Sequence, residues 1–268
     1  MKQRPSFPAR LDSVASSAKP QTLLGATRVL TKPQTTAART APTSLASPTG
    51  VGLDSSTIRA RMVQKLAEQG VDDKVVLDAM GRIERHRFVD SALVNQAYED
   101  TSLPIGLGQT ISKPNVVARM IALLREAPGL QGQVMGRVLE IGTGCGYQAA
   151  VLSLVAREVY SIERLRGLHD KARENLRPMR LPNVHMIFGD GMLGYPKGAP
   201  YSAIIAAAGG EAVPQAWVDQ LAVGGRIVAP MQTATGQQAL VVIDKTSQGL
   251  QQSLLEAVHF VPLKSGIA

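Results

Sequence analysis

The sequence is poor in cysteine, histidine and aromatic residues, and each shortage excludes a kind of protein. Its 268 residues include one cysteine, Cys145, four histidines and 4% aromatic residues. A single cysteine cannot form a disulfide within the chain or a four-cysteine zinc site, and it fits a reducing compartment. The histidines lack the spacing of metal ligands, so we expect no metal centre. No run of about 18 apolar residues occurs, so we expect no transmembrane helix.

Acidic residues are almost missing from the first fifty positions, and most of the net charge of +8 lies there. Residues 1–50 hold seven basic residues and one acid, whereas residues 51–268 hold 22 basic and 20 acidic residues. The second part is therefore nearly neutral, at +2, and we expect no nucleic-acid partner. The Ser, Thr, Ala and Pro content of residues 1–50 favours a disordered extension in a cytoplasmic protein. A transit peptide is the alternative interpretation.

Residues 51–268 are predicted to form one domain whose first part, 51–130, is helical. Apolar side chains recur there at helical spacing. The predicted helices begin at Ser55 or Ser56, at Asp72 or Asp73, and at Pro114, and the first ends at Gly70. A polar, glycine-containing loop over 98–112 separates the second helix from the third.

From residue 136 to 268 short apolar runs alternate with helical stretches. The predicted strands cover 137–141, 159–162, 184–188, 203–207, 226–229, 239–243 and 258–261. The predicted helices cover 147–156, 165–176 and 214–221. This alternation predicts an α/β fold with a doubly wound, mostly parallel, seven-stranded Rossmann-like sheet and helices on both faces.

A glycine-rich loop follows the first strand of this core. Gly142, Gly144 and Gly146 give the spacing G-x-G-x-G, whereas a dinucleotide site would place its third glycine where Tyr147 stands. Glu140 precedes the loop directly, which argues against an anionic ligand and favours a cationic one. Dehydrogenase chemistry with a nicotinamide dinucleotide is therefore the less favoured interpretation.

Three acids stand at the ends of consecutive predicted strands and indicate which cationic ligand the loop binds. S-adenosyl-L-methionine offers an ammonium group, for which Glu140 is suited, and two ribose hydroxyls. Glu163, 23 residues after Glu140, is placed to accept from both hydroxyls. Asp190, between Gly189 and Gly191, could accept from the exocyclic amine of adenine. Taken singly, each acid could equally be a solvated turn residue or a helix cap.

The chain resembles the protein-L-isoaspartate O-methyltransferase family, a class I methyltransferase family, over about residues 54–263. The most specific part is the stretch 97–114, which contains Gly108-Gln-Thr-Ile-Ser-Lys-Pro114. Further matches are 138–148, 159–164, 189–191, 220–226 and 260–263. Two departures are Cys145, where the family often has serine, and the stretch 206–211 after the fourth strand of the core.

The resemblance implies an enzyme that transfers a methyl group from S-adenosyl-L-methionine to the free carboxylate of L-isoaspartyl residues in damaged proteins and peptides, starting repair through a succinimide. It places a catalytic hydroxyl at Ser112. The expected cofactor-binding residues are Gln109, Thr110, Ile111, Glu140, Gly142, Thr143, Gly144, Glu163, Asp190, Gly191 and Gln238. The expected substrate contacts are Thr110, Ser112 and Val261. We expect a monomer without a metal.

The chemistry of the residues agrees with that expectation. A carboxylate with a pKa near 4 is already ionised at pH 7, so attack on a sulfonium methyl needs alignment and no strong base. From the residues alone, Ser112 before Lys113-Pro114 is an ordinary helix N-cap, and both roles can coexist.

Two further interpretations remain open. An RNA or DNA base methyltransferase would use the basic extension to bind phosphates, but the Asn/Asp-Pro-Pro-aromatic element of amino-directed enzymes is missing at 206–209. A binding module that has lost turnover is the non-enzymatic alternative.

Overall fold

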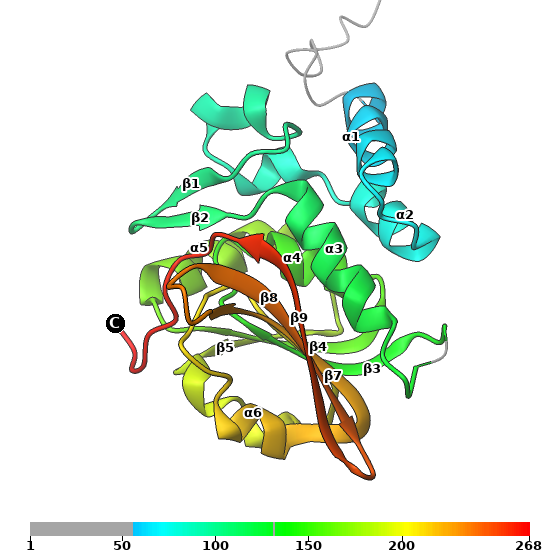
Figure 1. Ribbon diagram of the computed structural model, residues 1–268. Coiled ribbons are helices and arrows are strands. Elements are labelled where there is room, and N and C mark those ends of the chain that lie inside the picture. Colours follow the sequence, from blue (N-terminus) through cyan, green and yellow to red (C-terminus); the bar gives the residue numbers. More distant parts are fainter. Residues whose placement is uncertain (1–55, 131) are drawn as a thin grey trace, which may run out of the picture. The chain divides into compact units, whose positions relative to one another are not determined.

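The computed structural model describes residues 56–130 and 132–268, so the expectation for residues 1–50 lies outside the described residues. Figure 1 shows helices on both faces of a twisted sheet. The α-helices are α1 (Ser56–Glu68), α2 (Lys74–Arg82), α3 (Pro114–Arg125), α4 (Tyr147–Ser153), α5 (Arg166–Leu176) and α6 (Gln215–Gln220). The 3-10 helices are η1 (Arg85–Phe88), η2 (Ser91–Gln96), η3 (Arg177–Met179), η4 (Gly191–Leu193) and η5 (Pro196–Gly198).

Seven strands form the main sheet in the order β5-β4-β3-β6-β7-β8-β9. Their bounds are β3 (Met135–Ile141), β4 (Ala156–Glu163), β5 (Val184–Phe188), β6 (Tyr201–Ala206), β7 (Leu221–Gln232), β8 (Gln238–Thr246) and β9 (Gly249–Val258). The strands from β5 to β7 are parallel, and β8 and β9 are antiparallel additions. The predicted mostly parallel sheet is therefore confirmed. The strand order reverses at β3, where an open α/β sheet binds its ligands.

Successive side chains of the central strands belong alternately to two apolar cores. Val138 of β3 and Ile205 of β6 belong to the core shared with α1 to α5. Leu139 and Ile204, one residue away on each strand, belong to the core that contains Trp217 of α6. Successive strand residues point to opposite faces of a sheet, so this division places helices on both faces.

The helices α1, α2 and α3 pack on the same face of the sheet, and α2 begins at a capping side chain. Asp73 caps α2 by accepting from the backbone N–H of Val75 and Val76 at 2.8 and 3.1 Å. The other Asp73 oxygen accepts from Arg125 Nε of α3 at 2.6 Å, which joins the two helices. The prediction of a helix start at Asp72 or Asp73 is thus confirmed. No helix among the described residues is long and apolar enough to cross a membrane.

Several predicted elements differ from the structure in their bounds, and three of the differences matter for the site. The predicted loop over 98–112 contains an antiparallel hairpin, β1 (Leu103–Gly106) and β2 (Gln109–Ile111), too short for its alternation to be recognised. The helix predicted over 147–156 ends at Ser153. The strand predicted over 258–261 is wrong beyond Val258, and the last strand, β9, was missed because it is largely solvent-exposed and lacks the apolar pattern of a buried strand.

Candidate active site

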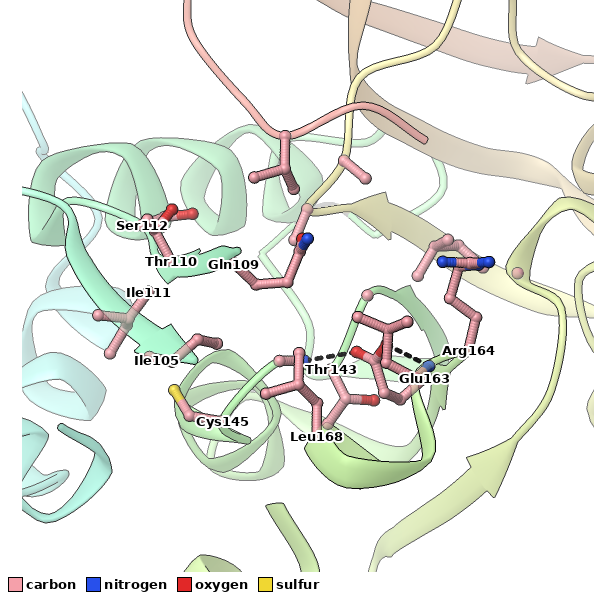
Figure 2. A pocket seen from close by; sticks show the side chains of 18 of the residues that line it. Ile105, Gln109, Thr110, Ile111, Ser112, Thr143, Cys145, Glu163, Arg164 and Leu168 are labelled. Carbon is pink, nitrogen blue, oxygen red and sulfur yellow. Dashed lines mark hydrogen bonds between the residues drawn. The ribbon is translucent and has the colours of Figure 1, made fainter. Parts of the chain in front are cut away.

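A cavity of about 510 Å³ lies at the carboxyl ends of β3 and β4. Its walls come from the glycine loop after β3, the hairpin β1–β2 and the segment after β9. Figure 2 shows residues of the hairpin on one side, with Glu163 and Arg164 on the other. The expected site residues that line it are Gln109, Thr110, Ile111, Ser112, Gly142, Thr143, Gly144, Glu163, Gly191 and Val261.

The glycine loop turns back on itself because its glycines adopt left-handed backbone angles. Gly142, Gly144 and Gly146 have φ of 90°, 57° and 91°, values that side chains with a Cβ disfavour. A Cβ at Gly144 would also lie 3.1 Å from Ile105 Cδ1 of the hairpin. Because Gly142 and Gly144 carry no side chain, the loop backbone borders the cavity directly and approaches the hairpin closely at Ile105.

Glu163 ends β4 and fixes the shape of the loop. Its Oε2 accepts from the Gly144 N–H at 2.9 Å, and its Oε1 accepts from the Leu165 N–H at 2.9 Å, as Figure 2 shows. The side chain is buried from solvent yet lines the cavity. Each carboxylate oxygen has a second lone pair, so Glu163 can still accept two hydrogen bonds from a ligand.

Glu140 lies one layer behind the cavity and does not line it. It is fully buried and accepts a hydrogen bond from the Ser161 hydroxyl, which is 2.6 Å from the hydroxyl of Thr143 on the cavity wall. Burial raises the pKa of Glu140 to about 8, and the neighbouring Ser161 and Gln148 side chains oppose that rise. Glu140 Oε1 and Gln148 Nε2 are both buried without a hydrogen-bond partner among the described residues.

Ser112 follows β2 and borders the cavity without capping α3. The N-cap residue of α3 is Lys113, and no side chain of its own caps the helix. Asp100, which precedes the hairpin β1–β2, instead accepts from the Asn115 N–H at 3.0 Å. The cap interpretation of Ser112 is therefore wrong, and its hydroxyl remains available to a bound molecule.

A second cavity, of about 530 Å³, meets the first at Ser112. It runs between the start of α3 and the segment after β9, past Lys113 and Phe260. The residues lining both cavities are Thr110, Ser112, Ala207 and Val261. Two molecules bound in the two cavities would thus meet beside the Ser112 hydroxyl.

Asp190 and Gln238 lie outside the cavity walls. Asp190 accepts from the Met192 N–H at 2.8 Å and from the Gly266 N–H at 2.6 Å. Gln238 holds Phe260 on both sides, accepting from its N–H at 2.7 Å and donating to its carbonyl at 3.2 Å. Both side chains therefore contact the segment after β9 in this structure.

Several lining residues were not predicted. They are chiefly apolar side chains of the hairpin, α5 and the segment after β9, together with Gln148, Arg164 and Lys264. Apolar residues carry no chemical signal in a sequence, but Gln148 stands inside a recognised motif and could have been proposed. Cys145 also lines the cavity; burial raises the pKa of its thiol to about 11, which opposes a nucleophilic role. Among the described residues, no group of three side chains could hold a metal ion.

The sequence is similar to one enzyme family along nearly all of its described length. The family model described as protein-L-isoaspartate(D-aspartate) O-methyltransferase (PCMT) matches residues 57–268. A protein-L-isoaspartate O-methyltransferase of Leptothrix cholodnii is 64% identical over 219 residues, covering 81% of this chain and 77% of that protein. Another, of Methylibium petroleiphilum, is 57% identical over 269 residues, covering 98% and 96%.

Solved structures are similar in fold. A structure of a protein-L-isoaspartate O-methyltransferase matches with a TM-score of 0.69 and 29% identity, covering 78% of this chain and 67% of that one. A structure from Plasmodium falciparum, described as a complex with S-adenosyl-L-homocysteine, matches with a TM-score of 0.64 and 24% identity, covering 77% and 98%. The second comparison supports the methyltransferase fold alone.

Proposed function

This chain belongs to the protein-L-isoaspartate(D-aspartate) O-methyltransferase family, and from that premise we propose how its two cavities carry out the family's reaction. The enzyme transfers a methyl group from S-adenosyl-L-methionine to the free carboxylate of L-isoaspartyl residues in damaged proteins and peptides. The methyl ester then closes to a succinimide, whose hydrolysis returns part of the site to normal aspartate.

The first cavity, beside the glycine loop, fits the cofactor, which supplies a methyl group bonded to a positively charged sulfur. Gln148 lines this cavity, and its Nε2 is a buried polar atom without a hydrogen-bond partner among the described residues; such an atom carries a cost that a polar ligand group would remove. Also on the cavity wall, Gly142 and Gly144 expose the loop backbone, and Glu163 offers free lone pairs for two ribose hydroxyls. Gln109, Thr110, Ile111, Thr143 and Gly191 complete the contacts on the cavity walls.

The second cavity, between the start of α3 and the segment after β9, fits the peptide. The Ser112 hydroxyl donates to the isoaspartyl carboxylate and orients one oxygen toward the methyl group, while Thr110 and Val261 border the same point. Because that carboxylate is ionised at neutral pH, no residue needs to remove a proton. The residues contribute alignment of the reacting atoms and exclusion of water.

The observation that carries this proposal is the meeting of the two cavities at Ser112. A methyl transfer needs donor and acceptor close together and in line, and cavities that share Thr110, Ser112 and Val261 bring both molecules to the same side chains. A cofactor-binding module without turnover would need only the first cavity.

A labelling experiment tests the proposal. The protein is incubated with S-adenosyl-L-methionine carrying a labelled methyl group and with either of two peptides, identical except for isoaspartate or aspartate at one position. We expect base-labile label on the isoaspartyl peptide alone. Label on neither peptide, or on RNA offered in a parallel reaction, would refute the proposed function.

Three finer expectations have their own measurements. A monomer should give a mass of 28.5 kDa in light scattering. Absence of a nucleic-acid partner should appear as unchanged mobility of labelled RNA and DNA at physiological salt. A cytoplasmic location, suggested by the single buried Cys145, is checked by cell fractionation.

A further inference from the structure

The segment after β9 is held at two places on opposite sides of the first cavity. The first place is Gly209, just after β6. The Gly209 N–H donates to the Val261 carbonyl at 2.8 Å, and the Leu263 N–H donates to the Gly209 carbonyl at 2.7 Å. These bonds fix residues 261–263 at the carboxyl end of β6.

The second place is Arg164, just after β4. The Ala268 N–H donates to the Arg164 carbonyl at 2.8 Å, and the Arg166 N–H donates to the Ala268 carbonyl oxygen at 2.8 Å. Two side chains add to this attachment: Arg164 Nε donates to the Gly266 carbonyl at 2.7 Å, and Asp190 accepts from the Gly266 N–H at 2.6 Å. Residues 266–268 are thus fixed at the carboxyl ends of β4 and β5.

The sheet order shows what lies beneath the segment. β3 stands between β4 and β6, so the chain passes over the carboxyl end of β3 on its way from Leu263 to Gly266. The glycine loop begins at that end, and Pro262, Leu263 and Lys264 line the cavity from above it. In Figure 2 Arg164 stands on the side of the cavity opposite Ser112, so the second attachment is remote from the reacting groups.

The two attachments differ in strength. At the β6 side the segment continues into Phe260, which is 8% exposed and held by Gln238 through two hydrogen bonds. At the β4 side residues 264–268 are all exposed, and the two side-chain hydrogen bonds to Gly266 are exposed to water. Exposed attachments with few apolar contacts open at the lowest free energy.

We propose that residues 264–268 form a latch that controls cofactor exchange, opening at its β4 side while the β6 side stays attached. Arg164 and Asp190 are its positioning residues, and they act on the cofactor through Gly266. The inference rests on the proposed function in one respect, that the first cavity holds S-adenosyl-L-methionine. It assigns Asp190 a role that its place at a strand end did not suggest.

The test measures both rate constants of cofactor binding, with labelled S-adenosyl-L-methionine and rapid filtration. One variant ends at Leu263. The second variant, Gly266→Pro, keeps Lys264 in the cavity wall. It removes the backbone N–H that donates a hydrogen bond to Asp190. Proline also cannot adopt the φ of +77° found at this position. Ser265→Ala, within the same segment but outside the cavity wall, is the matched control.

We expect association and dissociation to accelerate together by about tenfold in both variants, because only a few exposed hydrogen bonds hold the closed latch. Ser265→Ala should leave both rates unchanged. Asp190→Ala should accelerate exchange in the full chain but add little to Gly266→Pro, since both changes release the same contact.

Two results would overturn the latch. Dissociation that accelerates while association stays constant would make the segment part of the binding wall, and unchanged rates in both variants would remove any role in exchange. Failure of the unaltered protein to bind S-adenosyl-L-methionine would instead refute the proposed function, before any variant is compared.

Discussion

The buried carboxyl of Glu140 should make the ligand-free protein less stable as the pH rises. Burial raises its pKa from 4.5 to about 8, so the folded chain keeps a proton that the unfolded chain loses above pH 4.5. The stabilisation that is present at low pH is therefore lost progressively between pH 4.5 and 8. At 1.36 kcal/mol for each tenfold change in proton affinity, the loss is about 3 kcal/mol at pH 7 and at most about 5 kcal/mol above pH 8.

The substitution Glu140→Gln removes this penalty while keeping an oxygen that accepts from the Ser161 hydroxyl. At pH 5 the variant and the unaltered protein should have nearly the same free energy of unfolding. At pH 7 the variant should be more stable by about 3 kcal/mol, which corresponds to about 6–12 °C in melting temperature for a domain of this size. Urea unfolding of the ligand-free proteins at several pH values measures the difference.

The control is Glu211→Gln, which removes one carboxylate from an exposed loop position. The difference in free energy of unfolding between Glu211→Gln and the unaltered protein should not show the pH dependence expected for Glu140→Gln. A stability difference for Glu140→Gln that is the same at pH 5 and pH 8, or a variant that is less stable at pH 8, would refute the assignment of a neutral buried carboxyl.

Three further substitutions have separable expected effects. Ser112→Ala should lower kcat by about tenfold, the effect of one lost orienting hydrogen bond, with an unchanged melting temperature; an unchanged kcat would refute the orienting role. Glu163→Gln should weaken S-adenosyl-L-methionine binding by about tenfold in equilibrium dialysis, and an unchanged affinity would contradict the ribose assignment. Arg85→Met should destabilise the fold by about 2–4 kcal/mol in urea unfolding. Arg85 is fully buried and donates hydrogen bonds to the Ala97 and Thr101 carbonyls at 2.7 and 3.4 Å. A loss of stability below about 1 kcal/mol would show that water replaces those hydrogen bonds.

The parallel sheet and its glycine loop were predictable because both leave local signals. Buried parallel strands are short apolar runs, and alternation with helices sets their direction. Gly142 and Gly144 stand directly after such a run, and both adopt the left-handed angles for which glycine is needed. Glu163 stands at the end of a predicted strand, and that position alone was enough to predict that it lies at the cavity.

Other features depended on contacts that no local pattern records. The end of a strand fixes which edge of the sheet a residue occupies, but not which atom its side chain meets. Asp190 meets the N–H of Gly266, which is 76 residues away, and Gln238 meets Phe260, which is 22 residues away. The hairpin β1–β2 and strand β9 were missed because one is very short and the other is exposed.

Glu140 shows why a residue's charge is harder to predict than its position. Its place before the glycine loop correctly put an acid next to the cavity, but a sequence does not show whether a side chain points at the ligand or one layer behind it. Here Ser161 and Thr143 stand between the carboxyl and the cavity, and burial favours the neutral form until the pH approaches 8. A cation bound nearby favours the ionised form. Cofactor affinity in the unaltered protein should therefore rise between pH 6.5 and 8.5 by more than it does in Glu140→Gln, and equal pH profiles in dialysis would show that the cofactor's ammonium does not sense this carboxyl.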